Sequence, residues 1–94
     1  MTIHKVYVMS FYAEDRMGGF DWVDFETITL GGVIERLHED MVQAVEDGTW
    51  EWFIHAIDIP DYVCSDRITE YIEAEHLDSV ESPDGALVAV RMSS

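Results

Sequence analysis

The sequence has a single cysteine and no long apolar run, and each shortage excludes a class of protein. The single cysteine, Cys64, excludes an internal disulfide and a cysteine-based metal cage. No apolar run is long enough to span a bilayer, and no basic start precedes an apolar stretch, as it would in a secretory signal. We therefore expect one domain over residues 1–94, located in the reducing cytoplasm.

Basic residues are also scarce, because five Lys and Arg face twenty Asp and Glu. The net charge is −15 at pH 7 and the sequence pI is about 4.2. DNA, RNA and anionic membranes are excluded as direct partners, since each requires a positive patch. The hydrophobic fraction of 48% nevertheless supports a core and argues against disorder. The natural complement of this chain is a basic protein surface or a cation.

Four segments rich in β-branched and aromatic residues are predicted to be strands. They cover residues 3–12, 20–27, 49–57 and 86–92. The charged stretch 13–19 ends in two glycines and predicts a hairpin loop, while Pro83-Asp84-Gly85 predicts a turn.

Two amphipathic helices are predicted between these strands. From Leu30, apolar residues recur at three- and four-residue intervals, with Thr29 as N-cap and Gly48 as the stop. A second helix runs from a Ser65 cap to about His76. The order β-β-α-β-α-β predicts an α+β fold with a small, mainly antiparallel sheet and the helices packed on one face.

A search for catalytic and metal-binding motifs identifies none. The sequence contains no glycine-rich phosphate loop, nucleophile elbow or zinc-binding His-Glu-x-x-His motif. The acidic clusters at 21–26 and 58–61 lack the spacing of a calcium loop, which leaves only a weak cation site open. We predict a binding protein without metal or cofactor, and not an enzyme.

The carboxylates instead gather in rows on the two predicted helices and in the loop between them. Like charges four residues apart destabilise a helix by a few tenths of a kcal/mol per pair, and few lysines relieve them here. Rows of anions resemble a nucleic-acid backbone, so a protein that binds phosphates through Lys and Arg can bind these carboxylates in the same way. The predicted partner-binding residues are Glu35, Glu39, Asp40, Glu46, Asp47, Asp58, Asp61, Asp66, Glu70 and Glu73.

Two other interpretations of the acidic surface stay open. In the first, the chain is an acidic adaptor that binds a basic partner through ordinary mixed contacts. This interpretation requires an exposed aromatic patch. Alternatively, the acids only solvate the surface, and the protein folds poorly at low salt and has no basic partner.

Residues 5–62 resemble the N-terminal domain of the ArdA family of antirestriction proteins. The resemblance lies in Val-Tyr-Val at 6–8 with Tyr12, a glycine at 18 or 19, Trp-Val-Asp at 22–24, and Glu-Trp-Phe-Ile-His at 51–55. The chain departs from the family in its short length, in the loop before Gly18, and in Ala56 after the histidine.

The resemblance implies an acidic DNA mimic from a phage or mobile element. Such proteins occupy the DNA groove of type I restriction enzymes and usually work as dimers. The expected partner is therefore a basic DNA-binding protein or nuclease complex. A shortened relative also fits a CRISPR surveillance complex, which holds nucleic acid in a basic channel, so an anti-CRISPR function stays open as well.

Overall fold

A computed structural model of the protein describes residues 3–13, 16–44 and 49–93. Four antiparallel strands form one sheet in the order β2-β1-β3-β4. The strands are β1 (Ile3–Ala13), β2 (Arg16–Asp24), β3 (Thr49–Pro60) and β4 (Val88–Ser93). The helices are α1 (Leu30–Ala44), α2 (Ile68–Glu75) and α3 (Leu77–Val80), with a 3-10 turn, η1 (Ser65–Arg67), before α2. The predicted α+β class is confirmed, and the predicted element order roughly matches, with α3 as an additional short helix before the last strand.

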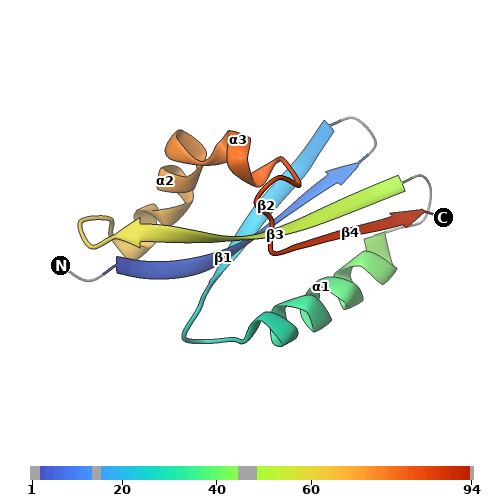
Figure 1. The fold of residues 1–94 in the computed structure, drawn as a ribbon, viewed down its shortest axis with the longest axis horizontal. Helices are drawn as coiled ribbons and strands as arrows, with labels where there is room; N and C mark the ends of the chain where they lie inside the picture. Colours follow the sequence, from blue (N-terminus) through green and yellow to red (C-terminus); the bar gives the residue numbers. More distant parts are fainter. Residues whose placement is uncertain (1–2, 14–15, 45–48, 94) are drawn as a thin grey trace.

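The helices lie on opposite faces of the sheet, and the prediction that both pack on one face is wrong. Figure 1 shows α1 on one side of the sheet, with α2 and α3 on the other side and toward the other end of its long axis. The physical reason is that β3 is apolar on both faces. Trp52 and Ile54 pack with α1, whereas Ile57 and Ile59 pack with α2. Side chains alternate along a strand, so a run that buries both faces needs a cover on each.

The core beneath α2 and α3 is aliphatic. Val6 and Val8 of β1 pack there with Ile68 and Ile72 of α2, and all four are almost fully buried. Burying one such side chain stabilises the fold by about 1.5–3 kcal/mol. The buried hydroxyl of Ser10 donates a hydrogen bond to the carbonyl of Val80, which ties the end of α3 to the sheet.

The core beneath α1 is more aromatic. Val33 and Leu37 of α1 are buried against Tyr7 and Trp52, and Phe25 stacks on Tyr7 with ring centroids 3.9 Å apart. The start of α1 is capped as predicted, because the Thr29 hydroxyl accepts a hydrogen bond from the Gly32 amide at 3.1 Å. The predicted stop at Gly48 lies outside the described residues.

Other predicted element ends are wrong as well: the third strand runs to Pro60 and not to Ile57, and the fourth begins at Val88 and not at Ala86. The first hairpin is tighter than expected, because Ala13 pairs with Arg16 and β2 continues through both glycines. Gly19 pairs with Phe11 and has φ +147°, and the register of β1 and β2 shifts just after Phe11. Gly19 is therefore part of a β-bulge and not of the turn. The β2 strand ends at Asp24 and not at Thr27, since a turn follows. Ser65 does not cap the second helix through its side chain.

The molecule is a rod of 46 × 25 × 22 Å, because β1 and β3 run along its length and pair over eleven positions. None of the described helices is long and apolar enough to cross a membrane. The staggered helices leave part of each sheet face without a helix above it (Figure 1). Charged side chains therefore reach solvent from the sheet as well as from the helices.

Candidate functional site

The predicted acidic residues do not gather on one surface. Glu35 and Glu39 are exposed on α1, and Glu70 and Glu73 are exposed on α2, across the sheet from them. Asp40 belongs to α1 but its side chain lies outside the described ones, and Glu46 and Asp47 lie outside the described residues. The two helical rows therefore face in different directions.

Asp58 and Asp61, near the end of β3 and just after it, also lie apart. Asp58 alternates with the buried Ile57 and Ile59, so its side chain points to the α1 side of the sheet. There its carboxylate lies 3.8 Å from the Lys5 ammonium. Asp61 belongs to the turn that follows β3 and leads toward α2. We call the exposed acids of this side the α2 surface: Asp61, Asp66, Glu70, Glu73, Glu75 and Asp78.

Most of the described carboxylates are exposed to solvent, and the ion pairs among them are weak. Of the fifteen acidic side chains that the structure describes, twelve are exposed and none is buried. The ion pairs to Lys and Arg measure 3.5–3.8 Å and are largely exposed, so each contributes at most about 1 kcal/mol. The described residues carry sixteen acids and five Lys or Arg, a net of −11.

The α2 surface contains an aromatic hollow. Tyr62, Val63, Arg67, Glu70 and Tyr71 line a depression of about 300 Å³. Tyr62 is 77% exposed, whereas Val63 and Tyr71 pack against the core beneath α2. Burial raises the pKa of the Tyr71 phenol, and repulsion from Tyr62 and Glu75 adds to the effect. Sequence reasoning missed this hollow.

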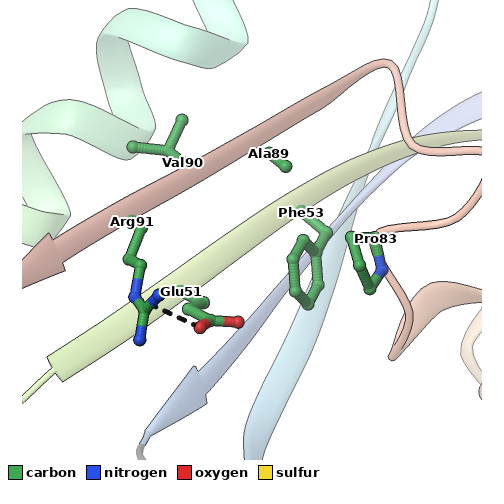
Figure 2. Close-up of a pocket in the computed structure, with 6 residues that line it drawn as sticks. All are labelled: Glu51, Phe53, Pro83, Ala89, Val90 and Arg91. Atoms are coloured by element: carbon green, nitrogen blue, oxygen red, sulfur yellow. Dashed lines mark ion pairs between the residues drawn. The ribbon is translucent and has the colours of Figure 1, made fainter.

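A second, smaller pocket lies beside the sheet between β3, β4 and the turn before β4. Figure 2 shows Phe53 and Pro83 at one end of it, and the Glu51–Arg91 ion pair at the other. The pocket measures about 210 Å³, and the Arg91 Nε lies 3.5 Å from the Glu51 carboxylate. Glu51 is the only acid in the lining and already pairs with Arg91, so this pocket has no unpaired carboxylate to bind a cation from a partner.

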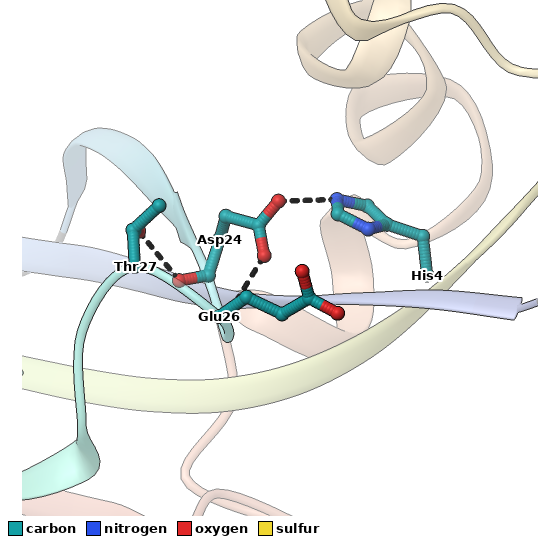
Figure 3. Close-up of polar contacts among 4 residues, drawn as sticks. All are labelled: His4, Asp24, Glu26 and Thr27. Carbon is teal, nitrogen blue, oxygen red and sulfur yellow. Dashed lines mark hydrogen bonds and ion pairs between the residues drawn. The ribbon is translucent and has the colours of Figure 1, made fainter.

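Asp24 of the Trp-Val-Asp step has a structural role. Figure 3 shows the Asp24 carboxylate between the His4 ring and the Glu26 backbone. The His4 Nε2 lies 2.9 Å from one carboxylate oxygen, and the Glu26 amide donates to the other at 2.9 Å. The Thr27 hydroxyl donates to the Asp24 carbonyl at 2.8 Å. These contacts hold the turn between β2 and α1, as an Asx-type turn does.

His55 is buried beneath the turn before β4 and is not available to a partner. Its side chain is only 4% exposed, and neither ring nitrogen has a hydrogen bond of normal geometry. Burial lowers the pKa of its imidazole below 6.5, although nearby backbone groups of Asp84 and Ser82 partly oppose this. His55 is therefore a packed histidine of the sheet.

Replacing His55 with Leu is expected to raise the free energy of unfolding by about 1 kcal/mol at pH 7, because an unsatisfied buried polar group is removed. The unfolded chain takes up a proton on His55 at about pH 6.5, before the folded one does. Above about pH 6.5, where His55 is neutral in the unfolded chain too, its protonation does not lower the free energy of unfolding of the wild type. As the pH falls below about 6.5, that free energy decreases. Urea titrations from pH 7 to 5 should show a flatter profile for His55→Leu.

The exposed His38 on α1 provides the control for this measurement. A His38→Gln variant should keep the wild-type profile. If His55→Leu titrates like the wild type between pH 7 and 5, burial of His55 does not set the pH dependence.

In the parts of the chain that the structure describes, no three His, Cys, Asp or Glu side chains come together as metal ligands. Comparison with family models, curated proteins and solved structures finds no match. The resemblance to the ArdA family and the functional assignment therefore stay predictions. The structural features that bear on function are the exposed carboxylates along the rod and the aromatic hollow on the α2 surface.

Proposed function

We propose that this protein is an acidic nucleic-acid mimic that inhibits a host defence nuclease by occupying its basic DNA-binding surface. The observation that supports this most is the net charge of −11 that the described residues carry along a 46 Å rod, with twelve of the fifteen described acidic side chains exposed. This is about one net negative charge per 4 Å of length. A single nucleic-acid strand carries one charge per about 3.4 Å, and a duplex one per about 1.7 Å.

The charge density fits one strand of nucleic acid better than a whole duplex. These charges are divided between the two faces of the sheet, so a groove that tracks one phosphate backbone with Lys and Arg meets the six acids of the α2 surface. Folded helices and strands support the mimic because the backbone positions that carry the carboxylates are set before the partner binds. Pre-organisation of this kind lowers the entropy cost of association.

Of the two acidic faces, the α2 surface is the better candidate for binding a basic partner. From Asp61 to Asp84 the chain has eight acids and one Lys or Arg, Arg67. On α1, the exposed Glu35 and Glu39 alternate with the exposed Arg36 and His38. An approaching basic surface is therefore attracted more strongly to the side of α2.

A second candidate function is an acidic adaptor, and the exposed ring of Tyr62 favours it. Exposed aromatic side chains are enriched among the residues that dominate protein interfaces. The adaptor and the mimic share a basic protein partner. They differ in how strongly salt weakens binding, because apolar contacts are not screened.

The proposal is tested by plating unmodified phage on a strain with a type I restriction system, with and without this protein expressed. We expect the plating efficiency to rise toward that of a non-restricting strain, because the enzyme's DNA-binding surface is occupied. Modified phage, which escapes restriction, should plate equally in both cases and controls for toxicity. An unchanged efficiency for unmodified phage would reject type I restriction as the target.

A further inference from the structure

The hollow on the α2 surface combines an aromatic wall with a carboxylate. Tyr62 forms the outer wall and is 77% exposed, while Val63 and Tyr71 form a floor anchored in the core. Glu70 lines the same hollow. Among the described residues, the other large exposed apolar side chain is Leu87, at 50%. The exposure of Tyr62 therefore coincides with a depression that a side chain can enter.

The electrostatic surroundings select a cation for this depression. Asp61 precedes Tyr62, Asp66 precedes Arg67, and both are exposed. Glu75 is close enough to Tyr71 to help raise the pKa of its phenol. With Glu70 in the lining, the carboxylates of Asp66, Glu70 and Glu75 outweigh the single guanidinium of Arg67.

We infer that the Tyr62–Tyr71 hollow binds an arginine side chain of the basic partner protein. The inference rests on the proposed function in that it requires a basic partner. A planar guanidinium stacks on a tyrosine ring and forms a two-pronged pair with a carboxylate. A lysine ammonium has no planar face and is more strongly hydrated, so it gains less in the same site.

The protein's own Arg67 shows that a guanidinium fits beside Glu70. The Arg67 Nη1 lies 3.5 Å from a Glu70 carboxylate oxygen. Both side chains are about 70% exposed, so this pair contributes little and exchanges readily with a partner's arginine. Arg67 is thus an internal competitor for the site.

The test uses two short synthetic peptides, one of alternating Arg and Gly and one of alternating Lys and Gly, titrated into the full chain by calorimetry. We expect the wild type to prefer the arginine peptide. Tyr62→Ala should weaken that binding about fivefold through loss of the cation–π contact. Tyr62→Phe, which keeps the ring, should retain it, as should the matched Leu87→Ala control.

Arg67 gives a second readout of opposite sign. Arg67→Ala should strengthen binding of the arginine peptide, because a competing guanidinium is removed from Glu70. Arg36→Ala changes the net charge equally, but Arg36 is exposed on α1, across the sheet. It should therefore have a smaller effect than Arg67→Ala.

The inference is overturned if Tyr62→Ala binds the arginine peptide as well as Leu87→Ala does, or if the wild type does not distinguish the two peptides. Either result leaves the proposed function standing, since a mimic without an aromatic anchor still inhibits its nuclease. Conversely, arginine selectivity that depends on Tyr62 supports the hollow even where phage restriction is unaffected. The two failures are therefore distinguishable.

Discussion

A variant with Glu70→Lys and Glu73→Lys is expected to lose about 100-fold in affinity for the type I restriction enzyme, or roughly 3 kcal/mol. Both side chains are exposed on α2. Each reversal removes an attraction and places a lysine against the partner's basic groups, and like charges across an interface cost several kcal/mol. The measurement is the concentration of variant that displaces labelled DNA from the enzyme.

The matched control is Glu35→Lys with Glu39→Lys on α1. It raises the net charge by the same four units, from −15 to −11. Because α1 lies across the sheet from α2, this variant should lose affinity by only about threefold, through the weakened overall field. Far-ultraviolet circular dichroism should show both variants to be folded.

Equal losses in the two variants would mean that the enzyme encloses the whole rod and that no single face binds. A larger loss in the α1 variant would place the interface on α1. Either outcome contradicts the assignment to the α2 surface.

The fold class was predictable because its signals are local. Apolar residues at three- and four-residue spacing indicate α1, and Val33 and Leu37 are indeed buried. The packing of the two helices on opposite faces was not predicted. A hydrophobic stripe shows that a helix packs, but it does not show on which face of a sheet. The signal was present in β3, where Phe53 and Ile54 are consecutive and both buried.

The acidic residues of the candidate site were predictable from composition, but their grouping was not. Asp58 and Asp61 are three apart in the sequence, yet Asp58 points to the α1 side while Asp61 belongs to the turn toward α2. The alternation of side chains along β3 divides them. Tyr62 was overlooked because aromatic residues usually indicate core. Its exposure depends on how the turn after β3 meets α2, which is a tertiary property.

Raising the salt concentration from about 50 to 200 mM is expected to weaken binding to the restriction enzyme about 300-fold. The α2 surface offers six exposed carboxylates. With the coefficient of about 0.7 per charge for a single strand, six charge pairs give a slope of about −4 in log affinity against log salt. The measurement is fluorescence anisotropy of the protein, labelled at its N-terminal amine, at a series of salt concentrations.

Salt should act in the opposite direction on the isolated protein, which provides the control. Screening the repulsion within a chain of net charge −15 stabilises it, so the urea midpoint should rise with salt. Weaker binding at high salt then cannot come from unfolding. A loss of less than about tenfold would contradict the mimic and favour an adaptor that binds mainly through the ring of Tyr62. Stability that rises with salt, without binding at any salt concentration, would mean that the carboxylates only solvate the surface.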